Sequence, residues 1–282
     1  MIYLFISTIS SVKDASAYAY PSQPSTSFYV HDSWLNSNTA YDQGKNYTNP
    51  GSSGDMILDF GRQVYDNSWG VWTTDNTCTF ISDYQVSTIV ENFMAGYNSN
   101  HSQSIRLYVG TNDDSYLSQG NPDWINSGRD WGNLVNSISN SGYCAISGAN
   151  DIESWAYGSF KTYGSDTYNW CNSYNAQTNK DMLNYGNQCA AIDPSAWSQD
   201  NVYQCSYGLP DDYVMPEIYF LVNAQQWVNI YNYNNMTFRG TMSQYGAPLY
   251  PGGQNTLLWL TAWEDLNDYI PNGNVCSSAT NI

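Results

Sequence analysis

Apolar runs of strand length alternate with segments of helical spacing from residue 55 to residue 266, and this alternation restricts the fold more than any other feature of the chain. Each run ends near a turn residue, and apolar side chains three and four positions apart follow it. Alternation of this kind builds parallel βαβ units, and seven or eight such units close into a barrel. We therefore predict an α/β protein with a single (β/α)8-like, TIM-type barrel over residues 55–282.

The individual elements follow from turn residues and helix caps. Strands are predicted at 56–61, 105–110, 143–148, 182–186, 202–208, 215–221 and 236–242. Helices are predicted at 83–96, 131–142, 166–176, 224–230 and 257–266. A doubly wound open sheet is the competing fold, but the first turn lacks the G-x-G-x-x-G phosphate loop that often accompanies it.

The N-terminal residues have a different texture. Residues 2–9 form a short apolar run, and small residues at Ala15, Ala17 and Ala19 follow at the spacing of a signal-peptidase site. Residues 1–19 are therefore predicted to be a signal peptide, truncated at its start because no Lys or Arg precedes the apolar run. Residues 20–54 are predicted to be a loop-rich segment with one short strand at 28–30. No stretch of the chain is long and apolar enough to predict a membrane span.

The cysteines support an extracellular or cell-envelope location. The chain has six, and none of them forms a C-x-x-C pair. In an exported protein this predicts up to three disulfides, for which fifteen pairings exist. Cys189 and Cys205 flank one loop-like segment and are the first choice for a local bridge.

Charge and composition restrict the partners. The chain carries 25 acidic and 8 basic residues, with a net charge of −17, and the basic residues are scattered. A nucleic acid or an anionic membrane would need a Lys/Arg patch, so both are disfavoured as partners. The 11 Trp and 26 Tyr residues, together with many amides and hydroxyls, suit the apolar faces and hydroxyl groups of sugars. We expect a carbohydrate polymer as the ligand, although the same aromatic residues also suit ordinary packing.

Polar residues gather where the predicted strands end. In a (β/α) barrel, reactive groups lie just beyond the carboxyl ends of the strands. The residues at these positions are Asp59, Asp113, Asp114, Asn150, Asp151, Glu153, Tyr185, Gln188, Glu217, Tyr219 and Gln244. One rim of the predicted barrel is therefore rich in carboxylates.

The sharpest candidate for catalysis is the pair Asp151 and Glu153. Two carboxylates two positions apart on an extended segment point the same way, and their repulsion would let Glu153 hold a proton while Asp151 stays charged. Glycoside cleavage needs such a pair, or a pair divided between strands, for which Glu217 or Asp59 is the distant partner. The structural alternative is that the pair caps a helix or binds Arg129 or Arg106.

Further residues are candidates for binding the substrate. Arg106 lies inside a strand and would act as a ligand clamp, or else pair structurally with Asp59 or Glu217. The full predicted substrate-binding set is Asn150, Trp155, Tyr185, Tyr219, Gln244 and Arg106.

Other chemistries find less support in the sequence. His31 and His101 lack metal-site spacing, and no G-x-S-x-G elbow occurs. The Asp- and Asn-rich segment 112–123 lacks the EF-hand pattern for calcium. We expect no metal at the site and no cofactor.

Three segments carry a resemblance to known proteins: Leu58-Asp59-Phe60-Gly61, Asn150-Asp151-Ile152-Glu153 and Met215-Pro216-Glu217. Over residues 55–282 the chain resembles a group of uncharacterised exported bacterial proteins with a glycoside-hydrolase-like barrel. More remotely, the acid placement is similar to that of barrel muramidases and to the end of the chitinase motif. This resemblance implies that Glu153 is the acid and that Asp151 orients an N-acetyl group.

Two functions therefore remain open from the sequence. The first is a secreted glycoside hydrolase that acts on a neutral or amino-sugar polysaccharide by carboxylate acid–base chemistry. The second is a non-catalytic carbohydrate-binding or cell-envelope interaction protein on the same barrel. Convergence of Asp151 and Glu153 on a space lined by aromatic residues would favour the first, and capture of both by arginine would favour the second.

Overall fold

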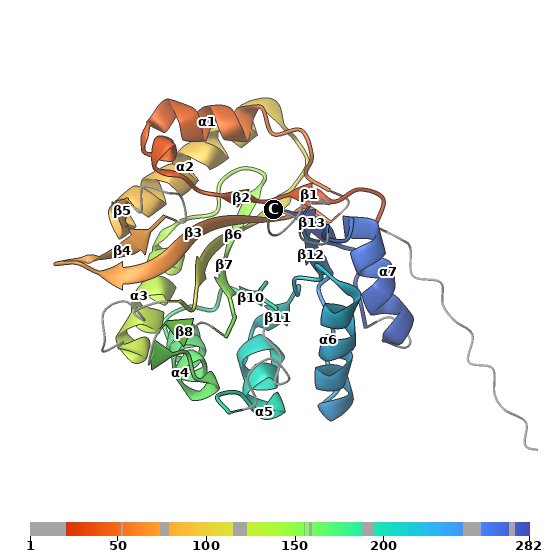
Figure 1. The fold of residues 1–282 in the computed structure, drawn as a ribbon. Helices are drawn as coiled ribbons and strands as arrows, with labels where there is room; N and C mark the ends of the chain where they lie inside the picture. The colour runs from red at the N-terminus through yellow and green to blue at the C-terminus, as the bar shows by residue number, and fades with distance from the viewer. Residues whose placement is uncertain are drawn as a thin grey trace, which may run out of the picture.

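A computed structural model describes residues 21–51, 53–73, 79–114, 123–154, 156–157, 160–187, 195–244, 255–270 and 274–282. Strands lie at the centre and helices surround them on the outside (Figure 1). The predicted signal peptide falls outside the described residues. None of the helices in the described part of the chain is long and apolar enough to cross a membrane.

Parallel pairings connect the central strands in sequence. β2 (Phe28–Tyr29) pairs with β3 (Asp55–Tyr65), β3 with β6 (Ile105–Asn112), and β6 with β7 (Cys144–Asp151). β7 then pairs with β10 (Met182–Asn184), and β10 with β11 (Asp212–Val214). These pairings form one wall of the barrel.

The remaining pairings lead from β11 through the last strands of the chain to its first strand. Parallel bridges from Val214 to Phe238 and from Glu217 to Met242 lead from β11 to β12 (Thr241–Ser243). β12 pairs with β13 (Ala279–Asn281), and β13 pairs with β1 (Ser25–Thr26). Only Ser27 separates β1 from β2, so the second set of paired strands continues along the chain into the first. The prediction of an α/β, TIM-type barrel is confirmed.

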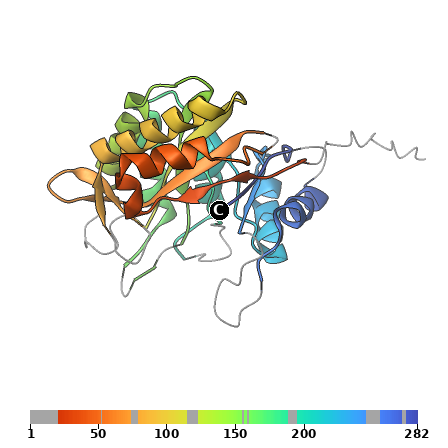
Figure 2. The same cartoon turned by 90° about the horizontal axis from the view of Figure 1, so that it is seen from above.

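Helices follow the strands along the chain and pack outside them. The helices are α1 (Ser37–Lys45), α2 (Asp83–Asn100), α3 (Trp124–Ser137), α4 (Gly164–Asn175), α5 (Gln199–Tyr203), α6 (Leu221–Tyr233) and α7 (Trp259–Tyr269). A short 3-10 helix, Asp32–Leu35, precedes α1. β4 (Trp69–Trp72) pairs antiparallel with β3 and β5 (Phe80–Ser82), and this hairpin projects beyond the barrel strands (Figure 2). β8 (Ala156–Tyr157) and β9 (Phe160–Lys161) form a second small hairpin.

Strand alternation divides the apolar core into two parts. Successive side chains on a strand point to opposite faces. One face packs under the helices in the larger cluster, which includes Met56 and Leu58 of β3. The other face fills the barrel interior, and its buried residues are Ile57, Tyr108, Ala149, Leu183, Tyr185, Met215 and Met242. The barrel is therefore a packed core and not a pore.

Polar contacts close the amino-terminal end of the barrel. The Asp55 carboxylate pairs with Arg239 at 3.2 Å and accepts a hydrogen bond from the Tyr108 hydroxyl at 3.2 Å. Arg106 pairs with Asp181 at 3.1 Å, and in the register of β3 with β6 it lies directly opposite Asp55. These contacts fix the end of the barrel that lies opposite the carboxyl ends of its strands.

Several element predictions need correction. The predicted strand at 202–208 is wrong, because this segment is α5 followed by a π-helix, Gln204–Gly208. Ser198 caps it by accepting the Asn201 N–H, and its buried residues Val202, Cys205 and Ser206 recur at helical spacing. The segment expected to be loops around one short strand also contains α1. Asn36 caps α1 by accepting the Asn38 N–H at 3.0 Å.

The disulfide prediction is also wrong for the described cysteines. Cys144, Cys171 and Cys205 are buried free thiols, and Cys276 is an exposed one. Cys205 faces the α4 helix, where its thiol approaches the Gly164 carbonyl at 3.8 Å, so it does not form the expected bridge to Cys189. Cys78 and Cys189 lie outside the described residues.

Close contact between α1 and α2 gives a test of the packing. A Cβ atom at Gly96 would lie 1.9 Å from the Tyr41 carbonyl oxygen, which is too close for any side chain. Gly→Ala at an exposed helix site stabilises by about 1 kcal/mol, but Gly96→Ala is expected to lower the free energy of unfolding by about 1 to 3 kcal/mol. Urea unfolding would measure this change. Exposed Glu91→Ala on the same helix should stay within about 0.5 kcal/mol, and a stabilised Gly96→Ala protein would contradict the packing.

Candidate active site

Period-two alternation carries functional side chains from the barrel interior to its carboxyl end. Four residues of the packed interior are each followed, two positions later, by a polar residue on the same face. The interior residues are Ile57, Ala149, Leu183 and Met215, and the polar residues are Asp59, Asp151, Tyr185 and Glu217. The apolar filling of the barrel therefore ends in a layer of carboxylates and one phenol, as the predicted rim requires.

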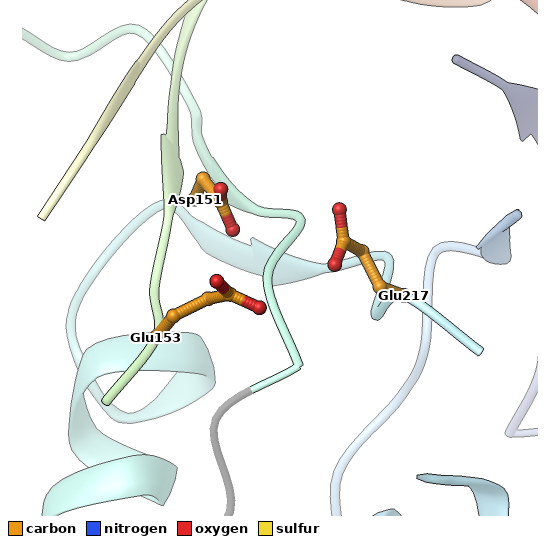
Figure 3. Close-up of side chains that lie close together, drawn as sticks. All are labelled: Asp151, Glu153 and Glu217. Atoms are coloured by element: carbon orange, nitrogen blue, oxygen red, sulfur yellow. The ribbon is translucent and has the colours of Figure 1, made fainter. Parts of the chain in front are cut away.

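Three carboxylates converge in this layer. Oxygen atoms of Asp151, Glu153 and Glu217 all lie within 4.8 Å of one another. Asp151 and Glu153 come from the end of β7, and Glu217 comes from the segment between β11 and α6, where it bridges to Met242. Figure 3 shows the three carboxylates pointing into a common space, two from one side and Glu217 from the other. The expectation that Asp151 and Glu153 point the same way is confirmed.

Burial and the neighbouring acidic groups favour protons on these carboxylates. Asp151 and Glu153 are partly buried, and Glu217 is only 4% exposed. Burial raises the pKa of Glu153 to about 7. Burial, with the charges of Glu153 and Glu217, also raises the pKa of Asp151 well above its usual range. Mutual repulsion was expected to leave Asp151 charged, but its surroundings favour the protonated form.

Asp59 lies beside this cluster, at the end of the barrel portion of β3. It is 1% exposed, and its carboxylate accepts the Gly61 N–H at 2.7 Å. Burial raises its pKa to about 6, and the hydrogen bond from the Gly61 N–H opposes that rise. Asp59 contributes charge to Asp151 and Glu217, while its own oxygens are bound by the protein. It therefore has a supporting place in the site.

Tyrosine hydroxyls surround the carboxylates. Tyr219 donates a hydrogen bond of 2.7 Å to Glu217 Oε1. Tyr185 donates to the Thr111 carbonyl at 3.0 Å and lies near Asp59. Tyr29, at the end of β2, lies near Glu217 and bonds to Tyr219. Tyr29 was not among the predicted site residues, although its place at the end of the strand predicted at 28–30 is the signal that could have identified it.

Asp113 positions the backbone of Glu153. Its Oδ1 accepts the Glu153 N–H at 2.9 Å, and its Oδ2 accepts the Thr167 hydroxyl at 2.9 Å. The carboxyl is fully buried, and burial raises its pKa. The sequence placed Asp113 on the rim, but only the fold reveals that it holds the loop that carries Glu153.

Two predicted contacts do not form at the site. Arg106 pairs with Asp181 at the amino-terminal end of the barrel, so it is neither beside the carboxylates nor paired with Asp59 or Glu217. Arg129 donates to Asn126 at 2.6 Å. These arginines thus bond elsewhere than to Asp151 and Glu153.

The remaining predicted binding residues are placed differently from one another. Asn150 is fully buried and points away from the barrel interior, because it alternates with Ala149 and Asp151. Gln244 stands two positions after the interior residue Met242, at the end of β12. Gln188 and the side chain of Trp155 lie outside the described residues.

The spacing of the three carboxylates would also allow them to share a cation. Among the described residues, no histidine or cysteine joins them. An acidic cluster alone does not identify a metal, and we assign none. We treat these residues as acid–base groups.

The raised pKa of Glu153 links this site to stability. A carboxyl whose pKa is raised by folding stabilises the folded state fully below its unfolded pKa and loses that contribution as the pH rises through its folded pKa. For Glu153 this window runs from its ordinary 4.5 to about 7. Glu153→Gln is therefore expected to raise the free energy of unfolding at pH 8 by about 1 to 2 kcal/mol, after allowance for solvent screening, and to change it little at pH 4.

Denaturant unfolding at both pH values would measure this difference. Glu91→Gln, an exposed substitution on α2, is the matched control and should show no such pH dependence. A Glu153→Gln protein that is less stable than the native protein at pH 8 would contradict the raised pKa.

Comparisons with known proteins give little guidance. No protein-family model matches the chain, and no curated protein matches it. Among solved structures, an N-acetylneuraminate lyase from Mycoplasma synoviae aligns with a TM-score of 0.45 and 8% sequence identity, over 93% of this chain and 67% of that one. The assignment below therefore depends on the geometry of the site.

Proposed function

We propose that this protein is a glycoside hydrolase that acts on a neutral or amino-sugar polysaccharide. The observation that carries the proposal is the convergence of Asp151, Glu153 and Glu217 at the carboxyl end of a parallel barrel, with oxygens within 4.8 Å of one another. Reactive groups of (β/α) barrels occupy this end, and glycoside cleavage requires paired carboxyl groups. The same layer contains phenols, which can bind sugar hydroxyls.

Glu153 is the proposed general acid. Its pKa of about 7 means that a large fraction holds a proton near neutral pH and can release it readily, as an efficient acid catalyst requires. It is partly exposed, so an incoming glycosidic oxygen can approach it. Asp113 holds the backbone of Glu153 in place by accepting a hydrogen bond from its N–H.

Glu217 is the proposed partner of Glu153. It comes from the segment between β11 and α6 and faces Glu153 across the common space, whereas Asp151, the last residue of β7, lies only two residues before Glu153. Retaining glycosidases place their two carboxyl groups about 5 Å apart, and inverting enzymes about 6.5 to 9.5 Å apart. The 4.8 Å limit on the oxygen separation favours retention, with Glu217 as the nucleophile.

The reaction then proceeds in two balanced steps. Glu153 gives its proton to the glycosidic oxygen as the bond to the anomeric carbon breaks, and a Glu217 oxygen forms an ester to that carbon. Water next attacks the anomeric carbon and gives a proton to Glu153, which releases Glu217. The pKa of Asp151 is raised by burial and by the charges of Glu153 and Glu217, and in its protonated form this residue can donate a hydrogen bond to the substituent at the sugar C2 position.

The proposed setting is outside the cytoplasm. It is supported by the signal-peptide pattern of residues 1–19 and by a composition rich in neutral polar residues. Expression of the full chain in a secreting bacterial host, followed by N-terminal sequencing of the protein in the medium or periplasm, tests this setting. Cleavage near Ala19 supports it, and an uncleaved cytoplasmic protein would argue against it.

The function is tested by comparing turnover with binding. The native protein is incubated with peptidoglycan, chitin and neutral plant or microbial glycans, and new reducing ends are measured beside pull-down on the insoluble polymers. The proposal expects release by the native protein and much less by Glu153→Gln. Equal release by both would remove Glu153 from its role, and pull-down without release would favour a non-catalytic carbohydrate-binding protein.

A further inference from the structure

Two tyrosines connect the end of the first barrel strand to Glu217. Tyr219 is 7% exposed, and its hydroxyl lies 2.7 Å from Glu217 Oε1. Tyr29 comes from β2, and its side chain forms a hydrogen bond with that of Tyr219. The order of contacts is therefore Tyr29, Tyr219, Glu217, and it draws together two segments that are far apart in the sequence.

The number of protons fixes the direction of this chain of hydrogen bonds. A phenol has one O–H to donate, and a carboxylate oxygen can only accept. Tyr219 must therefore direct its proton to Glu217 when Glu217 is charged, and its oxygen then accepts from Tyr29. Hydrogen bonds arranged in series polarise one another, so the Tyr29 hydroxyl strengthens the bond that Tyr219 makes to Glu217.

Glu217 needs such support because its surroundings oppose a negative charge. It is 4% exposed, and burial followed by the charge of Glu153 raises its pKa. The Tyr219 hydrogen bond acts against that rise. The ionisable groups that face Glu217 are Glu153, Asp151, Asp59, Tyr219, Tyr29 and Tyr185. Within this set the tyrosine hydroxyls are the hydrogen-bond donors, and Tyr219 is the one that donates directly to Glu217.

We infer that Tyr219 and Tyr29 are positioning residues that hold Glu217 as the charged member of the carboxylate cluster and so leave the transferable proton on Glu153. The inference deepens the proposed function, on which it rests for its catalytic meaning. It assigns a role to Tyr29, and it assigns to Tyr219 a contact with Glu217 in place of a contact with substrate.

The composition of the chain makes a direct test practicable. It contains only four glutamates, Glu91, Glu153, Glu217 and Glu264, so carboxyl-labelled ¹³C-glutamate gives four side-chain signals. Glu153→Gln and Glu217→Gln each remove one signal and assign it. A pH titration of the labelled full-length protein then follows both site glutamates without any substrate.

Tyr219→Phe is expected to raise the pKa of Glu217 by about one unit, because the charged form loses its donor. The pKa of Glu153 should fall at the same time, since the two carboxyls titrate as a coupled pair. Tyr29→Phe should shift both in the same directions by a smaller amount. Tyr84→Phe, an 81% exposed position on α2, is the matched control and should move neither.

An unchanged Glu217 titration in Tyr219→Phe, or one that moves downward, would overturn the inference. If Tyr219→Phe fails to fold, the Tyr29→Phe titration decides in the same way. Kinetics separates this result from the proposed function: with an active native protein, Tyr219→Phe should lower kcat about tenfold with little change in KM and shift the pH profile. A native protein without turnover would defeat the proposed function, while the titration would still test the role of the tyrosines.

Discussion

Glu217→Gln is expected to lower kcat by at least about 10³-fold on any glycan that the native protein cleaves, because an amide cannot form the ester to the anomeric carbon. The substitution preserves shape and can still accept the Tyr219 hydrogen bond. It also removes a charge from a side chain that is only 4% exposed. The folded variant should therefore be as stable as the native protein or more stable. Loss of activity in a protein of equal or greater stability would place Glu217 in the chemistry and not in the scaffold.

Initial rates of reducing-end release and denaturant unfolding would be measured on the same preparations. Glu91→Gln, on the exposed face of α2, should match the native protein in both. Glu217→Gly with added azide offers a second measurement, because a small anion can occupy the vacated space and form a glycosyl azide. A Glu217→Gln protein with at least one tenth of native kcat would rule out Glu217 as the nucleophile.

Glu153→Gln is expected to have the second largest effect, a loss of about 10²- to 10⁴-fold on polysaccharide, the range of general acid catalysis. The loss should depend on the leaving group. A sugar hydroxyl needs a proton as it departs, whereas an acidic phenol does not, so aryl glycosides should lose far less in the first step.

The pH profile gives an independent signature of the same residue. Native activity should fall as the pH rises through about 7, the raised pKa of Glu153, because the acid form is lost. Glu153→Gln should lack that fall. An equal loss on polysaccharide and aryl glycoside, with an unchanged alkaline limb, would show that the acid is another residue, with Asp151 the nearest candidate.

The sequence predicted most of the fold because its signals were local. Apolar runs such as that of β3 and the capped helix α2 depend on neighbouring residues, and parallel alternation implied the barrel. The segment at 202–208 was wrongly predicted to be a strand because Val202 and Cys205 suit a strand as well as a helix. Only the Ser198 cap distinguishes the helix from the strand. β13 and α1 were missed because they are short and polar, and tertiary pairing stabilises them.

The candidate site was predicted in part, for a similar reason. Asp151, Glu153 and Glu217 were found because the carboxyl ends of parallel strands meet at one rim. Arg106 was misplaced although it stands second in the strand predicted at 105–110, because only the fold shows that it lies opposite Asp55 there and pairs with Asp181. The links from Asp113 to Glu153 and from Tyr29 to Glu217 join distant segments, so only the fold brings them together.

The most direct measurement of the central claim is proton NMR of a defined oligosaccharide during its hydrolysis by the native protein. It reports cleavage and the configuration of the new anomeric centre at the same time. The separation of the Glu153 and Glu217 oxygens, within 4.8 Å, is close to the short spacing of retaining enzymes, so the first product signal should have the anomeric configuration of the substrate. The opposite anomer as first product, or no cleavage of any glycan that the protein binds, would contradict the account.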